Sequence, residues 1–451
     1  MRDLPPDRRA GRSLTDDVLH GTAKPAATAR FHRGHALGIA ALVTPFAQAY
    51  SWPIVTPIMV LAALGVLIAV RGRLARPPLV LAGLLVALAA YGAVTGLWAL
   101  SDKLALKAAW TIIATAIPGL VLVAAVRRLD PAERAWFDAC LVAGFVIGLA
   151  NMEVLLLTGG EVFDWLRQLS VVQALFGLPV IITLVMFDTQ MSLISLLIWP
   201  VVAVVYRRHG LVWAALIAAA GFAVVLQGLS GTAKLAYVVG AAALGAAWLF
   251  PRWSAAALGA VLALWIGLAP LLYESRVMDW GTELASRISP RISNSMVHRR
   301  AIWDFTVQRI HDRPVLGWGL GNSRIMPGSH QDATVGEGER IKGLELMPLH
   351  PHNAALQLWL ELGLPGVLLG VVFVGWIALI IGRLAAHPVH QALAVALVAA
   401  ILVNAASGYN LWHTWWMTFI WLAAIFLMAG LASAPAEPQS YTDRLRKPGR
   451  A

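Results

Sequence analysis

The sequence predicts an all-α, polytopic membrane protein with about twelve transmembrane helices and one large hydrophilic loop late in the chain. Of its 451 residues, 59% are hydrophobic and only 13% are charged, whereas about a quarter of the residues of a soluble protein are charged. Twelve spans of ~20 residues would use ~240 residues, which accounts for this apolar share. The 19 Trp residues fit the same class, because indole rings concentrate at membrane interfaces.

These proportions exclude a cytosolic enzyme, a nucleic-acid-binding domain and a disordered chain. The net charge of +11 comes partly from the two ends of the chain. Residues 1–34 carry seven Lys and Arg among many Pro, Ala and Gly, which indicates a disordered cytoplasmic tail rather than a cleaved signal peptide. Residues 433–451 form a similar basic tail. The single cysteine, Cys140, excludes a disulfide framework and a cysteine-ligated metal site.

Short basic loops alternate with loops that are poor in Lys and Arg. If the N-terminus is inside, every basic loop lies in the cytoplasm, as the positive-inside rule requires. We therefore expect nine spans in residues 35–273, three more in residues 353–432, and both termini in the cytoplasm. The expected spans are 35–52, 53–70, 77–99, 104–126, 136–157, 190–206, 211–229, 232–250, 254–273, 364–382, 388–407 and 412–432.

One further apolar stretch, residues 171–188, does not fit this count. A full helix there would place Arg207 and Arg208 outside the cell, against the same rule. We interpret the stretch as a re-entrant or interfacial segment, which is tolerated where protein buries its backbone.

Residues 274–352 form the long hydrophilic loop, on the side opposite the termini. Ten of the 35 Lys and Arg lie in it. The positive-inside rule is weak for long translocated loops, so the orientation stands. The concentration of positive charge indicates that the loop binds an anion.

Within this loop, residues 295–310 read as an amphipathic helix, with Ser293 or Ser295 as its N-cap. Arg300 precedes Asp304 by four residues, which is the spacing of an intrahelical ion pair. A solvent-exposed ion pair is therefore the simpler interpretation of Arg300, and a phosphate contact is the alternative.

Arg299 differs from its neighbour because no acidic residue lies three or four positions away. It shares one stripe of the predicted helix with Trp303. A guanidinium beside a membrane surface can bind a diphosphate with two parallel hydrogen bonds, and we favour that interpretation for Arg299.

The helix is followed by GWGLGNSR at residues 317–324. No strand–helix unit surrounds these glycines, so they are not a dinucleotide-binding fingerprint, and a tight loop is the simpler interpretation. Arg324, at the end of this loop, could supply a second phosphate contact.

The segment LHPHN at residues 349–353 precedes the next apolar run. His350 and His352 could form half of a metal site, but no third ligand stands at a suitable spacing, and a structural histidine is a further alternative. The helix end disfavours an imidazolium, so His352 could remain neutral and act as a base. Asn353 could cap the helix or orient the ring. The segment LGLPG at residues 362–366 should break this short helix from the next span.

Taken together, these motifs resemble the O-antigen ligase/O-antigen polymerase superfamily over roughly residues 190–382. The resemblance covers an Arg four residues before a Trp, a P-x-x-G-x-G segment, and an H-N pair followed by a Gly. In this chain the matching residues are Arg299, Trp303, Pro314, Gly317, Gly319, His352, Asn353 and Gly363.

The resemblance implies a GT-C-like, metal-independent glycosyltransferase of the bacterial inner membrane without a cofactor, acting on the periplasmic side. The donor would be a glycan on undecaprenyl diphosphate, and the acceptor a hydroxyl of lipid A–core or of another lipid-linked glycan. By the same resemblance, His352 would deprotonate the acceptor hydroxyl, and Arg299 would hold the diphosphate. No nucleic-acid partner is implied.

The sequence departs from the family at two arginines that members carry near the outer ends of earlier spans. Lys234 could replace one of them, without the bidentate geometry of a guanidinium, and Thr189 cannot replace the other. Arg300 or Arg324 could compensate. An O-antigen ligase is our first interpretation and a polymerase of the same superfamily the second.

Two classes outside this superfamily also remain open. A polysaccharide or lipid transporter would place substrate-binding charges in the middle of the membrane, whereas here they lie in one outer loop. A structural membrane subunit would leave the arrangement of Arg299 and His352 unexplained.

Overall fold

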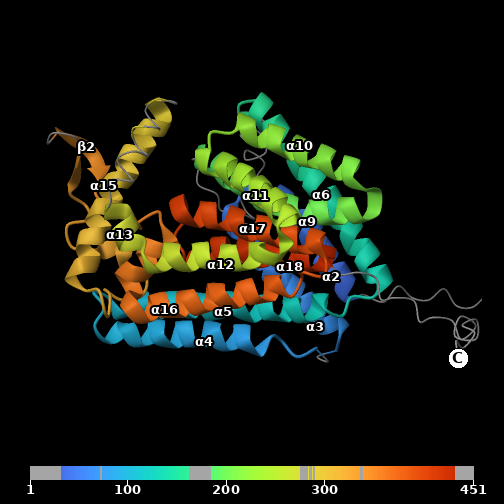
Figure 1. The fold of residues 1–451 in the computed structure, drawn as a ribbon, viewed down its shortest axis with the longest axis horizontal. Coiled ribbons are helices and arrows are strands. Elements are labelled where there is room, and N and C mark those ends of the chain that lie inside the picture. The colour runs from blue at the N-terminus through green and yellow to red at the C-terminus, as the bar shows by residue number, and fades with distance from the viewer. Residues whose placement is uncertain are drawn as a thin grey trace, which may run out of the picture.

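The structure, a computed structural model, describes residues 32–71, 74–161, 184–274, 290–335 and 339–431, with residues 283 and 287. It is almost entirely helical (Figure 1). The elements are α2 (Arg33–Tyr50), η1 (Trp52–Ile54), α3 (Val55–Ala69), α4 (Leu79–Val94), η2 (Thr95–Leu97), α5 (Asp102–Val126), α6 (Pro131–Leu157), α9 (Leu184–His209), α10 (Leu211–Gln227), α11 (Gly231–Leu249), α12 (Pro251–Gly267), α13 (Ala269–Glu274), α15 (Pro290–Asp312), η3 (Ser323–Ile325), β1 (Asp332–Val335), β2 (Glu339–Glu345), α16 (Ala354–Gly382), α17 (Pro388–Ser407) and α18 (Thr414–Leu431).

Eleven of the twelve expected apolar runs each correspond to one long helix of the body, and the run 254–273 is divided between α12 and α13. Within the described residues, nine helices are long and apolar enough to cross a membrane, and α10 is a shorter apolar helix. The predicted class, a polytopic helical membrane protein, is confirmed. Helices dominate because a lipid environment requires every backbone polar group to be satisfied within its own segment.

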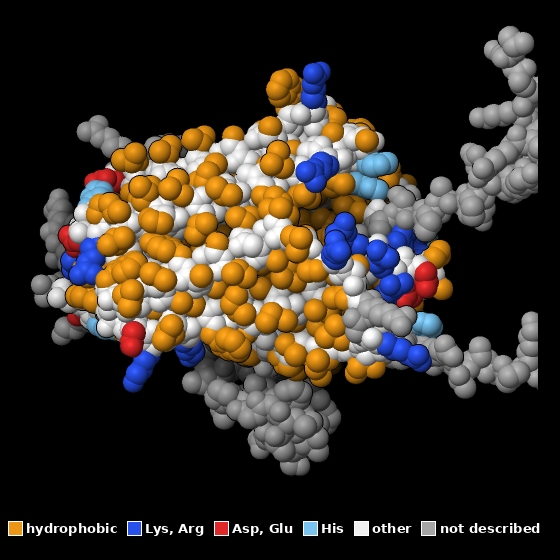
Figure 2. Space-filling model, turned by 90° about the horizontal axis from the view of Figure 1, so that it is seen from below, with side chains coloured by type: hydrophobic (Ala, Val, Ile, Leu, Met, Phe, Trp, Pro, Cys, Tyr) orange, Lys and Arg blue, Asp and Glu red, His pale blue; other side chains and the backbone are white. Residues whose placement is uncertain are grey.

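The surface is consistent with that environment. Large apolar side chains are exposed along the body, among them Leu79 (72%) and Trp110 (67%). Figure 2 shows apolar side chains covering the middle of this face, with most of the visible charged side chains toward its two ends. Such an apolar band bounded by charge is expected of a surface that faces lipid.

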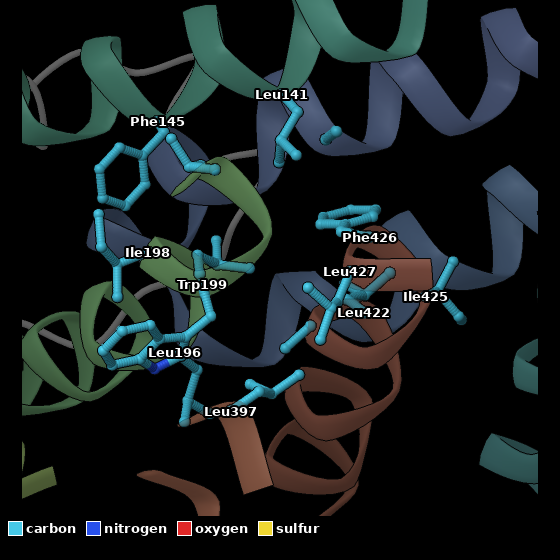
Figure 3. Packing of buried hydrophobic residues seen from close by; sticks show 14 of the residues in the cluster. Leu141, Phe145, Leu196, Ile198, Trp199, Leu397, Leu422, Ile425, Phe426 and Leu427 are labelled. Atoms are coloured by element: carbon cyan, nitrogen blue, oxygen red, sulfur yellow. The ribbon is translucent and has the colours of Figure 1, made fainter. Parts of the chain in front are cut away.

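The centre of the body is a buried cluster contributed by helices that are far apart in sequence. Side chains from α6, α9, α17 and α18 meet there (Figure 3). The cluster combines many alanines with large uncharged residues, including Phe145, Trp199 and Phe426. In addition, α11 packs along α17 and α12 packs along α16.

Small residues allow α2 and α6 to approach closely. At Gly144 an added Cβ would lie 2.5 Å from the carbonyl oxygen of Ala41, and at Gly148 it would lie 2.6 Å from the Cβ of Pro45. These two glycines have the four-residue spacing of the small-residue contacts that are common between membrane helices. Pairing of α2 with α6 therefore depends on both positions having no side chain.

The two ends of the body differ in chemistry. At one end, Arg33 at the start of α2 pairs with Glu133 at the start of α6, with 2.8 Å between Nε and Oε2. Arg207 and Arg208 at the end of α9 both bind the buried carboxylate of Asp138. The other end of α2 lies one helix length away, ~27 Å for 18 residues, and there the histidines described below are found.

Several segments differ from the expected arrangement or lie partly outside the described residues. Most of residues 171–188 lies outside the described residues, and its last residues belong to α9. The tails also lie outside them, except for the first residues of α2. The amphipathic helix is present as α15, but it begins at Pro290, so the predicted N-cap at Ser293 or Ser295 is wrong. Finally, β1 and β2 form an antiparallel ribbon that the predicted all-α class did not include.

Candidate active site

The glycine loop after α15 docks against a kink in α16. Gly363 interrupts α16 with φ 59° and ψ −157°, and its φ lies in a region that favours glycine. The amide of Trp318 donates to the carbonyl of Leu360, and the amide of Gly319 donates to that of Glu361, both at 2.9 Å. The break that LGLPG predicts is present as this kink, and the loop satisfies carbonyl groups beside it.

A buried carboxylate, Glu361, organises the same region. Four donors address it: the amide of Gly321, the hydroxyl of Ser323, the side-chain amide of Gln357 and the indole N–H of Trp412. These donors come from the glycine loop, from α16 and from the loop between α17 and α18. Glu361 therefore joins three segments that are distant in the sequence.

The loop between α17 and α18 is also held by Gln357. Its side chain accepts from the amide of Leu411 at 3.0 Å and donates to the side-chain oxygen of Asn410 at 3.2 Å. This attachment fixes the position of Gly408 and His413, at the two ends of the loop, relative to the start of α16.

The ring of His352 is oriented by Gly408. Nδ1 lies 2.7 Å from the carbonyl oxygen of Gly408. A carbonyl can only accept, so Nδ1 carries the proton and donates, and Nε2 of the neutral ring carries a lone pair. His352 has φ 51°, which is uncommon for a residue with a side chain, and its amide donates to Nδ1 of His350 at 3.1 Å.

Burial keeps the three neighbouring histidines neutral. The ring of His350 is 4.1 Å from that of His352 and 5.8 Å from that of His413. The pKa of His352 is lowered to about 4, mainly by burial; the bond to Gly408 opposes this shift, and the nearby charge of Arg299 contributes to it. Burial also lowers the pKa of His350 and of His413, with Arg324 contributing to both shifts. A neutral His352 was expected from the helix end, but burial is the largest cause.

Trp303 connects α15 to this histidine segment. Its indole N–H donates to the carbonyl of Pro351 at 2.9 Å, and its ring lies edge-on to Tyr273 at 4.7 Å. Asn353 is the N-cap of α16, because its side chain accepts from the amides of Ala355 and Leu356 at 3.1 Å. The capping role expected of Asn353 is confirmed.

The two adjacent arginines of α15 have different surroundings. Arg300 pairs with Asp304, with 3.0 Å between Nε and Oδ2, which confirms the ion pair expected from the spacing. Arg299 is half-buried, burial lowers its pKa, and its charge reaches the ring of His352. Arg299 is thus the arginine of this pair that acts on the histidines, and its role in binding stays a prediction.

Two further predicted cations lie at different places around the histidines. Arg324, in η3, is exposed and its charge acts on His350 and His413. Lys234 lies in the first turns of α11, where Thr232 bonds the hydroxyl of Ser407 at 3.0 Å. That contact places the start of α11 near Gly408.

Sequence reasoning missed His413, Gly408 and Glu361. A signal was present for two of them, because Glu361 is a lone acid in an apolar run and His413 stands at the start of the last span. Gly408 acts through its backbone and has no such signal. Among the described residues, no three His, Cys, Asp or Glu side chains form a group suited to a metal ion.

Comparison with known proteins identifies the family to which this region is similar. The family model described as O-antigen ligase matches residues 214–371, a range that contains Arg299, Arg324 and His352. Part of the chain is also similar to proteins that carry the name "Putative polysaccharide ligase". One from Rickettsia typhi is 26% identical over 243 residues, which cover 54% of this chain and 58% of that protein.

A second relative, from Rickettsia conorii, is 32% identical over 132 residues, which cover 29% of this chain and 31% of that protein. A third, from Rickettsia felis, is 26% identical over 255 residues, which cover 54% of this chain and 58% of that protein. The chain thus spans at most somewhat over half the length of these relatives. The predicted resemblance to the O-antigen ligase family is confirmed.

Proposed function

We propose that this membrane protein of the O-antigen ligase family transfers a glycan from undecaprenyl diphosphate to a sugar hydroxyl of lipid A–core. The observation that carries the proposal is the hydrogen bond between Nδ1 of His352 and the carbonyl of Gly408. It leaves Nε2 as the basic nitrogen of a neutral ring beside the positive charge of Arg299. A base and a fixed cation are the two groups that this transfer needs.

In the proposed reaction, Nε2 of His352 takes the proton of the acceptor hydroxyl as its oxygen attacks the anomeric carbon of the donor. The bond from that carbon to the diphosphate breaks, and undecaprenyl diphosphate leaves with the electron pair. A diphosphate is already a good leaving group, so a positioned base can supply ~10²–10⁴-fold of the acceleration.

Arg299 would stabilise the charge that develops on the leaving diphosphate. Its half-buried guanidinium acts in surroundings where electrostatic interactions are stronger than in water. Arg324, whose charge acts on His350 and His413, and Lys234 at the start of α11 are candidates for additional phosphate contacts. Arg300 is the weaker candidate, because Asp304 already accepts from it.

The proposed setting is the bacterial inner membrane, with twelve spans in a GT-C-like arrangement and the histidines on the periplasmic side. Support comes from the opposite positions of the arginine clusters and the histidines along α2. Arg33, Arg207 and Arg208 lie at the end that the positive-inside rule assigns to the cytoplasm.

The surface glycans of a deletion strain test this proposal. Loss of a ligase should leave bare lipid A–core together with accumulated long lipid-linked polymer, and wild-type protein should restore the modified core. Cores capped by a single repeat would instead identify a polymerase. Unchanged surface glycans would overturn the proposal.

A further inference from the structure

A cleft of about 420 Å³ lies next to the three histidines. It is lined by Trp52, Pro53, Thr56, His413, Thr414 and Trp415. Its volume is within the range of ~300–1,000 Å³ that is typical of sites for small molecules. The ring of His413, in the wall of the cleft, is 5.8 Å from that of His350, so the cleft adjoins the candidate active site.

The walls of the cleft are held in place by contacts behind them. The hydroxyl groups of Thr56 and Thr418 are 3.1 Å apart and join α3 to α18. The ring of Trp415 lies edge-on to Tyr409 at 4.7 Å and to Phe419 at 5.6 Å. The ring of Trp415, a residue that lines the cleft, is therefore held in one orientation, which reduces the entropy lost when a ligand binds.

The chemistry of the lining distinguishes among ligands. Two indole rings provide faces of negative potential, on which the C–H groups of a sugar ring can pack. Thr56, Thr414 and the neutral ring of His413 offer donors and acceptors for its hydroxyl groups. Among the described residues that line the cleft there is no Lys or Arg, so a phosphate would contact no cation in its wall, and Arg324 acts on His413 only from outside that lining. A polyprenyl chain would leave these polar groups unsatisfied.

The position of the cleft indicates which glycan would occupy it. Arg299, which we propose to bind the donor diphosphate, belongs to α15, and α15 packs against α13 and α16. The cleft is formed instead by η1, the start of α3 and the start of α18. The histidines connect these two regions, since Arg299 acts on His352 and the ring of His350 lies next to both other rings.

We propose that this cleft is a subsite for one sugar of the acceptor glycan. A sugar stacked on Trp52 or Trp415 would hold the acceptor beside His413 and extend the next sugar, with its reactive hydroxyl, toward His352. This inference rests on the proposed function and adds to it the site at which the acceptor is recognised.

Kinetics of Trp52→Ala and Trp415→Ala in the full-length protein test the inference. Loss of one stacking face should raise KM for the acceptor roughly two- to tenfold. KM for the donor and the turnover at saturating acceptor should stay near the parent values. The matched control is Trp213→Ala on α10, whose side chain is 60% exposed outside the cleft; it should change neither KM.

Trp415 also packs against Tyr409 and Phe419, so its removal could destabilise the fold. Trp415→Phe keeps a ring in that packing and a smaller stacking face, and it should raise KM for the acceptor less than Trp415→Ala. Thermal unfolding of every variant shows which proteins are folded, and only the KM values of folded variants are compared with the parent. A higher KM for the donor alone would assign the cleft to the donor and overturn the inference.

A binding measurement separates this inference from the proposed function. The probe is a lipid-free core oligosaccharide, titrated into the purified parent and Trp52→Ala proteins by calorimetry. Weaker binding to the variant supports the subsite even if no transfer is detected, in which case the proposed function alone fails. No saturable binding to the parent, or equal binding to both proteins, overturns the subsite even if transfer is active.

Discussion

Glu361→Gln tests whether the buried carboxylate of α16 joins three segments of the site. In the structure its Oε2 accepts from the amide of Gly321 and the indole of Trp412, and its Oε1 accepts from Ser323 and Gln357. The substitution keeps the shape of the side chain but converts one of these oxygens into a donor.

The loss of stability in Glu361→Gln depends on which of the four donors can instead accept a hydrogen bond from the new NH₂ group. An amide N–H and an indole N–H can only donate, so the remaining oxygen should face Gly321 and Trp412. The new NH₂ group then faces Ser323, whose hydroxyl can accept, and Gln357, whose NH₂ group cannot. Gln357 cannot simply flip, because its oxygen accepts from Leu411. One unsatisfied buried donor costs ~1–3 kcal/mol.

Because the entropy of unfolding of a 451-residue chain is about 1 kcal/mol/K, we expect a fall in Tm of roughly 1–3 °C for Glu361→Gln, measured by thermal unfolding of the purified protein in detergent. The matched control is Glu153→Gln, whose partner Gln227 lies in an exposed hydrogen bond; its stability should change by less than ~0.5 kcal/mol. An unchanged Tm for Glu361→Gln would contradict a carboxylate that accepts from four donors, because it would mean that the carboxyl is already protonated and donates to one of its neighbours.

Three further predictions concern pH, metal ions and topology. Burial is the main cause that lowers the pKa of His352 to about 4, so its ring should stay neutral as the pH falls from about 8 to about 5. The rate of transfer should therefore fall only as the pH passes through about 4. A loss of transfer centred near pH 6.5 would contradict the assignment of His352 as the base. Transfer should persist in excess EDTA, and a loss that a divalent ion reverses would instead indicate that His350 and His352 bind metal. Reporter fusions should place Gly328 in the periplasm and Arg73, Arg208 and Arg444 in the cytoplasm; a cytoplasmic signal at Gly328 would contradict the topology.

The helices could be predicted from the sequence because lipid leaves few other structures open to an apolar run. The same physics does not determine which helices meet. The contact of α2 with α6 depends on Gly144 and Gly148, and only the tertiary packing shows that both glycines of α6 face α2. The ribbon of β1 and β2 lies in a polar loop, where hydropathy carries no signal.

The candidate site was predictable where its contacts are local. The ion pair of Arg300 with Asp304 and the cap formed by Asn353 both follow from residue spacing within one helix. The bond from His352 to Gly408 joins residues 56 positions apart. Such a contact depends on how α16 packs against α17, so the sequence predicted His352 as a candidate base but not the group that orients its ring.

The assignment of His352 as the base and of Arg299 as the diphosphate ligand is tested by measuring donor binding and glycan transfer in His352→Ala and Arg299→Ala, with purified protein and a lipid-diphosphate glycan. Arg299→Ala should weaken donor binding and raise the barrier to transfer by about 2–4 kcal/mol, and Arg299→Lys should keep partial activity. His352→Ala should leave donor binding nearly intact and reduce turnover by ~10²–10⁴-fold. Transfer at the parent rate by a folded His352→Ala protein would contradict the assignment of His352 as the base.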